Sequence, residues 1–263
     1  MGSEMCIRDS LKTSGWLKKK ILKKYYHRLS HIVGVSKGVV SELITIDERL
    51  INKSSCIYNG FDLDEIKRKS MAISVIDLTG YRAKYDKVIL MVGRLTEQKD
   101  YKTAIKAMSK LKENGYCLLI AGDGYLKEEL NDLVLDADCS NVFFLGHLDN
   151  PFPLMCQSDI FLLSSKWESF GNVIVEALAL GCPVISSDCP YGPAEILESG
   201  KYGLLFDVGD VDGLVRSVLQ MSANKKMMNS EILINRSLDF STRIQVEKLE
   251  FIINNIPLID FAS

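Results

Sequence analysis

The chain has 263 residues, of which 47% are hydrophobic and 25% are charged. These fractions are typical of globular proteins, so they exclude disorder, collagen and a coiled coil as descriptions of the whole chain. No run approaches the roughly 20 apolar residues that cross a bilayer, and the residues MGSEMCIRDS lack the apolar core of a secretory signal. The seven Cys form no C-x-x-C pair, which favours reduced, buried thiols in a cytosolic protein over disulfides or a zinc site.

Basic residues gather in the first part of the chain. The net charge is −2, yet residues 1–31 hold eight Lys or Arg and two Asp or Glu, which gives +6 and leaves −8 for the rest. The stretch KKKILKKYYHRLSHI predicts a basic amphipathic helix, and residues 17–28 of it could contact an anionic membrane surface. An ordinary solvated helix face explains the same pattern. Nothing else in the chain is basic in bulk, which argues against nucleic acid as a partner.

Strand and helix patterns alternate from residue 87 onward. Short apolar runs predict strands at 87–93, 117–122, 141–146, 159–165, 183–188 and 203–206. Helical spacing of apolar residues predicts helices at 99–112, 125–137, 172–180 and 210–221. Such repeats are typical of α/β proteins, so we expect a Rossmann-like, doubly wound parallel sheet with helices on both faces.

The segment before this sheet carries about one and a half further β-α units. Within residues 11–58 we expect a strand at 31–36, a helix at 37–44 and a strand at 55–60. One strand pair with two helices leaves most apolar faces exposed, so this segment needs another domain or a partner chain to cover it. The tail, residues 231–256, predicts one or two more helices.

Candidate ligand-binding residues follow the predicted strands, because ligands of open α/β sheets bind beyond the carboxyl ends of the strands. After the first strand, Gly93 allows a tight turn, and Arg94 and Lys99 supply two cations. Two cations at a strand end suit a diphosphate, which Arg can hold through two oxygens and Lys as a point charge. Arg and Lys are common on protein surfaces, so this pattern alone does not distinguish a diphosphate site from ordinary surface residues.

After the second strand comes GDGYLKEEL, where Gly122 and Gly124 flank Asp123 just before a helix. Backbone N–H groups at a helix N-terminus attract anions. The pattern is not a complete G-x-G-x-x-G, so it does not imply a nicotinamide cofactor. A plain strand-to-helix turn explains the same residues, and this motif alone slightly favours that interpretation.

The most informative stretch is KWESFGNVIVEALALG. Glu168 lies in its loop, and Glu176 follows inside a helix that is otherwise apolar. A carboxylate among apolar residues costs free energy unless it is hydrogen-bonded or paired. The two hydroxyl groups of a ribose would satisfy it, and so would a neighbouring Lys or the backbone. The backbone of Phe170, Gly171 and Asn172 opens this helix and offers N–H groups to an anion.

The segments GRLTEQKD, LLIAGDG, NVFFLGHLDN, SSKWESFGNVIVEALALGCPVISSD and GPAEIL together resemble the C-terminal half of GT-B glycosyltransferases, above all those of the retaining family 4. Glu168 and Glu176 match the E-x7-E motif of that family. The resemblance implies that Arg94 and Lys99 hold the diphosphate of the sugar donor, that Glu168 contacts the donor sugar, and that Glu176 binds the ribose. His147 lies where the family contacts the nucleotide base. The catalytic positions implied are Glu168, Arg94 and Lys99.

The resemblance also implies a reaction. A hexose or N-acetylhexosamine would pass from a nucleotide sugar, with a UDP-sugar expected, to a glycan or lipid-linked acceptor with retention of configuration. The family generally needs no metal, so neither a metal nor another cofactor is expected. In its reaction the leaving diphosphate takes the acceptor proton, so no enzymic nucleophile is expected. The D-x-D of Asp62 and Asp64, a metal-binding pattern in GT-A enzymes, falls in the linker between GT-B domains. By analogy we expect a role in bacterial polysaccharide synthesis, in the cytoplasm or at the inner face of the plasma membrane.

The same resemblance sets the expected domains. We expect a non-native scar at 1–10, a remnant of the acceptor-side domain at 11–58, and a donor-binding domain at 59–230. Helices at 231–263 should pack back toward the N-terminal domain. His27 and His31 are then surface or packing residues rather than the catalytic His of the family.

A chain of this kind should bind a nucleotide sugar but transfer little sugar alone, because transfer needs both substrates held in position. Two alternatives remain: a non-catalytic donor-binding subunit of a split glycosyltransferase, and a GT-B-like nucleotide-sugar epimerase. The E-x7-E spacing favours transfer over epimerisation. The sugar, the acceptor and the linkage do not follow from the sequence.

Overall fold

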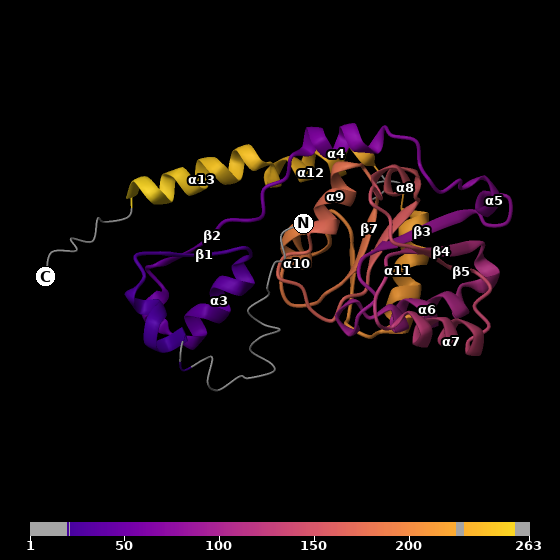
Figure 1. Ribbon diagram of the computed structural model, residues 1–263, viewed down its shortest axis with the longest axis horizontal. Helices are drawn as coiled ribbons and strands as arrows, with labels where there is room; N and C mark the ends of the chain where they lie inside the picture. Colours follow the sequence, from indigo (N-terminus) through magenta and orange to yellow (C-terminus); the bar gives the residue numbers. More distant parts are fainter. Residues whose placement is uncertain (1–19, 21, 225–228, 256–263) are drawn as a thin grey trace, which may run out of the picture. The chain divides into compact units, whose positions relative to one another are not determined.

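The structure is a computed structural model that describes Lys20, residues 22–224 and residues 229–255, and it divides into two compact units (Figure 1). The first unit combines the described residues up to Gly60 with those from Thr242 onward, and the second runs from Phe61 to Ser241. The scar predicted at residues 1–10 lies outside the described residues.

The second unit contains a sheet of six strands that are all parallel to their neighbours. The strands are β3 (Lys87–Val92), β4 (Tyr116–Ala121), β5 (Val142–Gly146), β6 (Ile160–Leu163), β7 (Val184–Ser187) and β8 (Leu204–Phe206). Their near-continuous apolar runs are typical of strands that are covered on both faces. The six strands and the α/β fold class predicted from the sequence are confirmed.

The order of the strands is β5-β4-β3-β6-β7-β8. From β3 the chain moves outward to β4 and β5, then returns to β6 on the other side of β3. In register, Val92 pairs with Ala121 of β4, and Leu90 pairs with Phe161 of β6. The direction of winding therefore reverses between β3 and β6, and a crevice outside the strand ends is expected at such a switch point.

Helices cover both faces of this sheet (Figure 1). One layer consists of α6 (Tyr101–Lys110), α7 (Lys127–Asp136) and α11 (Val211–Ala223). The other consists of α4 (Leu63–Ser70), α8 (Phe152–Gln157), α9 (Asn172–Ala179) and α12 (Ser230–Ser237). The shorter elements are α5 (Thr79–Arg82), η3 (Glu97–Lys99), η4 (Lys112–Asn114), α10 (Pro193–Ile196), η5 (Glu198–Gly200) and η6 (Leu238–Phe240). Ile89, Leu118 and Ile120 are fully buried and belong to the core under the first layer.

The described part of the predicted tail, residues 231–255, is divided between the two units, and residues 256–263 lie outside the described residues. Its first helix, α12, packs on α9 of the second unit. Ser230 Oγ donates to the carbonyl of Gly181 (3.1 Å), and Arg236 donates to the carbonyls of Glu195 and Ile196 (2.8 and 2.9 Å). The second unit therefore extends beyond the predicted boundary at residue 230, and only the segment from Thr242 belongs with the first unit.

The segment expected to be a linker contains helix α4. The Asp62 carboxylate accepts a hydrogen bond from the backbone N–H of Glu65 (2.9 Å), which is the usual contact of an N-cap. Ile66 is the buried residue of this helix. The first Asp of the D-x-D pattern therefore has a structural role in starting the helix.

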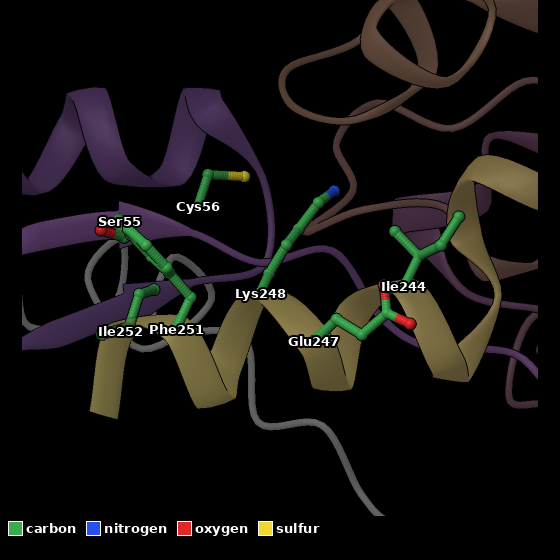
Figure 2. A pocket seen from close by; sticks show the side chains of 7 residues that line it. All are labelled: Ser55, Cys56, Ile244, Glu247, Lys248, Phe251 and Ile252. Atoms are coloured by element: carbon green, nitrogen blue, oxygen red, sulfur yellow. The ribbon is translucent and has the colours of Figure 1, made fainter. Parts of the chain in front are cut away.

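The first unit is built around two short parallel strands, β1 (Ile32–Gly34) and β2 (Ser54–Cys56). The remaining elements are η1 (Tyr26–Arg28), α3 (Lys37–Ile46), η2 (Glu48–Leu50) and α13 (Thr242–Asn255). Figure 2 shows Lys248 and Phe251 projecting from α13 beside a pocket of about 570 Å³ that β2 also borders. None of the predicted site residues lines this pocket.

The basic segment is described in part. Lys20 and residues 22–25 are helical, and η1 follows, whereas residues 17–19 and 21 lie outside the described residues. Nδ1 of His27 lies 3.2 Å from the carbonyl oxygen of Lys23, and Nε2 of His31 lies 2.9 Å from Ser55 Oγ. Both His rings therefore make contacts within the first unit. Membrane contact through residues 17–28 stays a prediction.

Candidate functional site

The predicted site residues follow strands on both sides of the switch point. Gly93, Arg94 and Lys99 follow β3, and Glu168 follows β6, the neighbour of β3 in the sheet. Because the carboxyl ends of parallel strands share one edge, the loops that follow them meet there. The fold therefore brings residues from separate sequence motifs to the same edge of the sheet.

Lys99 and Glu168 are in direct contact at this edge, although 69 positions separate them. Lys99 Nζ donates to Glu168 Oε1 at 2.6 Å, and Ser165 Oγ donates to the same oxygen at 2.7 Å. The residue Glu168 is only 7% exposed. Among the residues that the structure describes, none donates a hydrogen bond to Oε2. The carboxylate thus has one oxygen with two donors and one oxygen available to a ligand.

Further contacts join the loop after β3 to the loop after β6. The Lys166 N–H donates to the carbonyl of Gln98 (2.7 Å), and Gln98 Nε2 donates to the carbonyl of Trp167 (2.9 Å). Ser164 Oγ donates to the carbonyl of Lys99 (2.8 Å). Both loops are therefore fixed to one another through backbone groups, and the Lys99–Glu168 pair lies between segments that are held in place.

Arg94 differs from Lys99 in its surroundings. Its side chain is exposed, and within the described residues it forms no ion pair and no hydrogen bond. A guanidinium without a partner keeps all five of its N–H donors available to an anion. Judged by the contacts of the described residues, Arg94 is therefore a free cation and Lys99 a paired one.

The glycines after β4 serve the packing of this edge. A Cβ atom on Gly122 would lie 1.9 Å from the carbonyl oxygen of Gly93, so only glycine fits there. The Gly122 N–H donates to the carbonyl of Gly146 (2.7 Å), and the Gly124 N–H donates to Asp123 Oδ1 (2.8 Å). Both N–H groups are thus engaged within the protein, which weakens the expectation that they bind an anion.

Asp123 and His147 lie at the exposed side of this edge. The N–H of Gly124 lowers the pKa of Asp123, and Lys127 adds to the effect, so the carboxyl is ionised at neutral pH. His147 follows β5, is exposed, and has Nε2 3.3 Å from Asp149 Oδ1. Neither side chain contacts Lys99 or Glu168 among the contacts of the described residues.

Helix α9 starts directly after the loop that carries Glu168. Gly171 has φ +100° at its N-cap, a left-handed conformation that favours glycine, and Asn172 is the first helical residue. The ring of Phe170 is 1% exposed, with ring centroids 6.5 Å from Phe61 and 5.7 Å from Phe240. Phe170 therefore belongs to the core through its side chain, and only its backbone could meet a ligand.

Glu176 lies in the second turn of α9 between Val175 and Ala177, both of which are fully or almost fully buried. Burial raises the pKa of Glu176 to about 7. No side chain or N–H group in the described part of the chain pairs with its carboxyl group. This half-buried group therefore has no donor from the described part of the protein, and hydroxyl donors of a ligand would favour its ionised form.

Cys189 follows β7 and is buried. Burial, with a contribution from the Glu168 carboxylate, raises its pKa to about 12. A thiol in these surroundings stays protonated at neutral pH and is a poor nucleophile.

Two serines that contribute to the geometry were missed by sequence reasoning. Ser165 donates to Glu168, and Ser187 Oγ donates to the carbonyl of Ser165 (2.6 Å). Both are fully buried. The available signal was a pair of serines at the end of two apolar strands, in DIFLLSS and PVISSD. Hydroxyl groups at the end of a buried strand need acceptors, which the neighbouring strand and loop provide.

Two features of the described residues bear on the class of site. No group of three or more His, Cys, Asp or Glu residues in that part of the chain could hold a metal ion. No helix in the described ranges is both long enough and apolar enough to cross a membrane.

A family model matches this chain: glycosyl transferases group 1, over residues 81–234. Among similar proteins, an N-acetylgalactosamine-N,N'-diacetylbacillosaminyl-diphospho-undecaprenol 4-alpha-N-acetylgalactosaminyltransferase of Campylobacter jejuni is 30% identical over 80% of this chain and 55% of its own length. The lipopolysaccharide core biosynthesis glycosyltransferase LpsE of Rhizobium meliloti is 35% identical over 61% of this chain and 50% of its own length. The chain therefore spans about half the length of these two relatives.

Solved structures share the fold. The Anabaena protein Alr3699/HepE, in complex with UDP and glucose, superimposes with a TM-score of 0.76 at 21% identity, covering 92% of this chain and 67% of that protein. A glycosyltransferase of Rickettsia africae superimposes with a TM-score of 0.75 at 22% identity, covering 92% and 67%. At this identity the likeness establishes the architecture alone.

Proposed function

Because the chain belongs to the glycosyl transferases group 1, we propose that its second unit binds a nucleoside-diphosphate sugar, with a UDP-sugar as the expected donor, and that the protein transfers the sugar to an acceptor. The observation that carries this proposal is the convergence of Lys99 and Glu168 at the switch point. This is the place where open α/β sheets bind ligands.

Arg94 and Lys99 are proposed to bind the diphosphate. Arg94 has free donors and can chelate two phosphate oxygens. Lys99 uses one N–H on Glu168, so its ammonium group keeps two further donors for the same anion. As the bond to the sugar breaks, negative charge develops on the diphosphate, and two fixed cations stabilise it without a metal ion in this proposal.

Glu176 is proposed to bind the ribose. A carboxylate can accept hydrogen bonds from both vicinal hydroxyl groups at once. The raised pKa of Glu176 is about 7, so a fraction of the free protein carries a protonated carboxyl group that must ionise on binding. What supports this role is the absence of another partner for Glu176 in the described residues.

Glu168 is proposed to face the donor sugar through Oε2. Its position is set by Lys99 and Ser165, which both occupy Oε1. Transfer with retention is proposed, in which the acceptor oxygen attacks from the side of the leaving diphosphate. The bond between the anomeric carbon and the diphosphate oxygen breaks, the acceptor oxygen bonds to that carbon, and the acceptor proton passes to the diphosphate.

For the acceptor we propose a glycan or a lipid-linked saccharide, and for the transferred group a hexose or an N-acetylhexosamine. The support comes from the names of the relatives, one of which acts on a diphospho-undecaprenol substrate and another in lipopolysaccharide core synthesis. The epimerase and split-subunit alternatives have no observation in their favour among these relatives.

The test is calorimetric titration of the 263-residue chain with UDP, UDP-glucose and UDP-N-acetylglucosamine, with NAD+ as a control and EDTA present. The proposal expects saturable binding of UDP that EDTA leaves unchanged, and no binding of NAD+. Arg94→Ala should weaken this binding about ten- to a hundredfold. Lys106→Ala should leave it unchanged, because Lys106 is an exposed cation on α6. Absence of UDP binding to the folded chain would contradict the proposal.

A further inference from the structure

Ser165 lies two residues beyond the end of β6 and is fully buried, and its hydroxyl reaches the Glu168 carboxylate at 2.7 Å. A hydrogen bond to a charged group is stronger than one between neutral groups, and a serine on a strand end has little freedom to move. The hydroxyl therefore restricts the orientation of the carboxylate.

The backbone of Ser165 is itself held from the neighbouring strand. Leu163 of β6 pairs with Ser186 of β7, and beyond this pair Ser187 Oγ donates to the carbonyl of Ser165 at 2.6 Å. Ser187 is fully buried. A side chain thus extends the contact between β6 and β7 past their last backbone pair, and it does so at the residue that holds Glu168.

Lys99 alone would be a weaker means of fixing Glu168. Its ammonium group lies on a flexible stem, and in the proposed function it must also bind the diphosphate. When Lys99 turns toward the phosphate oxygens, its hold on Glu168 Oε1 weakens. Ser165 has no second acceptor among its side-chain contacts in the described residues, so it stays on Oε1.

From these contacts we propose that Ser165, held by Ser187, is a positioning residue. It fixes Oε1 of Glu168 so that Oε2 remains the oxygen that accepts a hydrogen bond from the donor sugar. The inference rests on the proposed function for the role of Glu168, and it adds a determinant of how tightly the sugar part of the donor is bound.

The neighbouring Ser164 does not contact Glu168. It is equally buried, and its hydroxyl donates to the carbonyls of Lys99 and Asp100 (2.8 and 3.0 Å) and not to the carboxylate. Its contacts stabilise the loop after β3. The orientation of Glu168 is therefore assigned to Ser165 and not to the serine pair as a whole.

The test compares UDP with UDP-sugars on wild-type protein and Ser165→Ala. Ser165→Ala should bind UDP as wild type does. It should bind UDP-glucose or UDP-N-acetylglucosamine, whichever wild type binds more tightly, about three- to tenfold more weakly. Ser165→Thr keeps a hydroxyl and should recover most of the affinity. Ser158→Ala is the matched control, since it removes a buried hydroxyl that donates only to the carbonyl of Leu154.

A Glu168→Gln background separates positioning from general stability. Because Ser165 acts through the Glu168 carboxylate, Ser165→Ala should change the affinity for the UDP-sugar much less in Glu168→Gln than in wild type. A loss of the same size in both backgrounds would overturn the inference, and so would an equal loss for UDP and UDP-sugar. If Ser165→Ala does not fold, Ser187→Ala tests the same point. It should weaken the binding of the UDP-sugar more than that of UDP, by a smaller factor than Ser165→Ala. An unchanged ratio of the two affinities would contradict the inference.

Failure of this inference is distinguishable from failure of the proposed function. If wild type binds UDP and UDP-sugars and Ser165→Ala binds them all equally well, only the positioning role of Ser165 is wrong. If wild type binds none of them, the proposed donor site is wrong, and the role of Ser165 with it.

Discussion

The loop after β6 and helix α9 each carry one glutamate of the E-x7-E motif, and they give it opposite surroundings. Glu168 in the loop accepts two hydrogen bonds from Lys99 and Ser165. Glu176 in the helix has no partner in the described residues, and burial raises its pKa to about 7. The first carboxylate is therefore organised before any ligand arrives, whereas the second is left for the ligand to satisfy.

This difference predicts opposite effects on stability. Removing the partner of Glu168 leaves a buried charge with fewer hydrogen bonds, which destabilises the fold. Neutralising Glu176 removes a half-buried carboxylate that has no donor among the described residues, which stabilises the fold. A carboxylate that lowers the stability of the free protein does not help the chain to fold. Its presence at the site is better explained by a role in ligand binding.

The largest expected effect is that of Lys99→Ala. The Glu168 carboxylate would then keep only the hydrogen bond from Ser165. The free energy of unfolding should therefore fall by about 2–4 kcal/mol, near the range for breaking buried ion pairs. Denaturant unfolding measures this. Lys106→Ala, at an exposed position, should stay within about 0.5 kcal/mol of wild type. The double variant Lys99→Ala/Glu168→Gln should recover part of the lost stability. Equal stability of Lys99→Ala and Lys106→Ala would contradict a stabilising contact between Lys99 and Glu168.

Glu176→Gln should raise stability, and the gain should depend on pH. The pKa of this group is about 7 in the folded chain against a reference value of 4.5. Between these values the folded state binds more protons than the unfolded state, so this group reduces stability as the pH rises from about 4.5 to about 7. The variant should therefore gain on the order of 2 kcal/mol at pH 8 relative to wild type, and little near pH 4.5.

Urea unfolding at both pH values checks the Glu176 prediction. Glu128→Gln, an exposed position on α7, is the control and should show no such gain. A Glu176→Gln protein that is less stable than wild type at pH 8 would mean that the carboxylate contributes to the fold, and the comparison with Glu168 would fail.

Arg94→Ala should affect binding alone. Arg94 is exposed and without a partner in the described residues, so the melting temperature should not change. Affinity for UDP should fall about ten- to a hundredfold, because one or two charge-assisted hydrogen bonds to the diphosphate are lost. Calorimetric titration measures this, with Arg243→Ala, an exposed Arg on α13, as the control. Unchanged UDP affinity would remove Arg94 from the proposed site.

The smallest expected effect is the pH dependence of UDP binding. Hydroxyl donors of the ribose favour the ionised form of Glu176, so binding should release protons, and affinity should fall by about three- to tenfold from pH 8 to pH 6. Titrations in buffers of different ionisation enthalpy count the protons released. Glu176→Gln should lose this part of the pH dependence, and an identical pH profile in wild type and variant would contradict the role.

Much of the fold was predictable, because its information is local. Apolar runs such as KVILMVG and CLLIAG fix the strands, and Gly181, with φ +68°, ends α9 as expected. Helix α4 was missed because it is mostly charged and buries only Ile66. The boundary at residue 230 was missed because α12 belongs to the second unit through contacts with α9 and α10 that the sequence does not reveal.

The candidate site residues could be proposed from the sequence, but their pairings could not. The contact of Lys99 with Glu168 depends on β3 and β6 being neighbours, which follows from the winding of the sheet and not from sequence distance. The engaged N–H groups of Gly122 and Gly124 depend on Gly146 and Asp123 in their folded places. Whether Glu176 has a partner did not follow from the sequence either, because a neighbouring Lys or the backbone could also have satisfied a carboxylate in an apolar helix.

The most direct test of the account is the binding of UDP and of a UDP-sugar to Glu168→Gln and Glu176→Gln at pH 8. Glu176→Gln should weaken both ligands by the same factor, because both carry the ribose. Glu168→Gln should leave UDP binding nearly unchanged and weaken the UDP-sugar selectively. Equal losses for UDP and UDP-sugar in Glu168→Gln, or unchanged UDP affinity in Glu176→Gln, would contradict the claim that the two glutamates bind different parts of one donor.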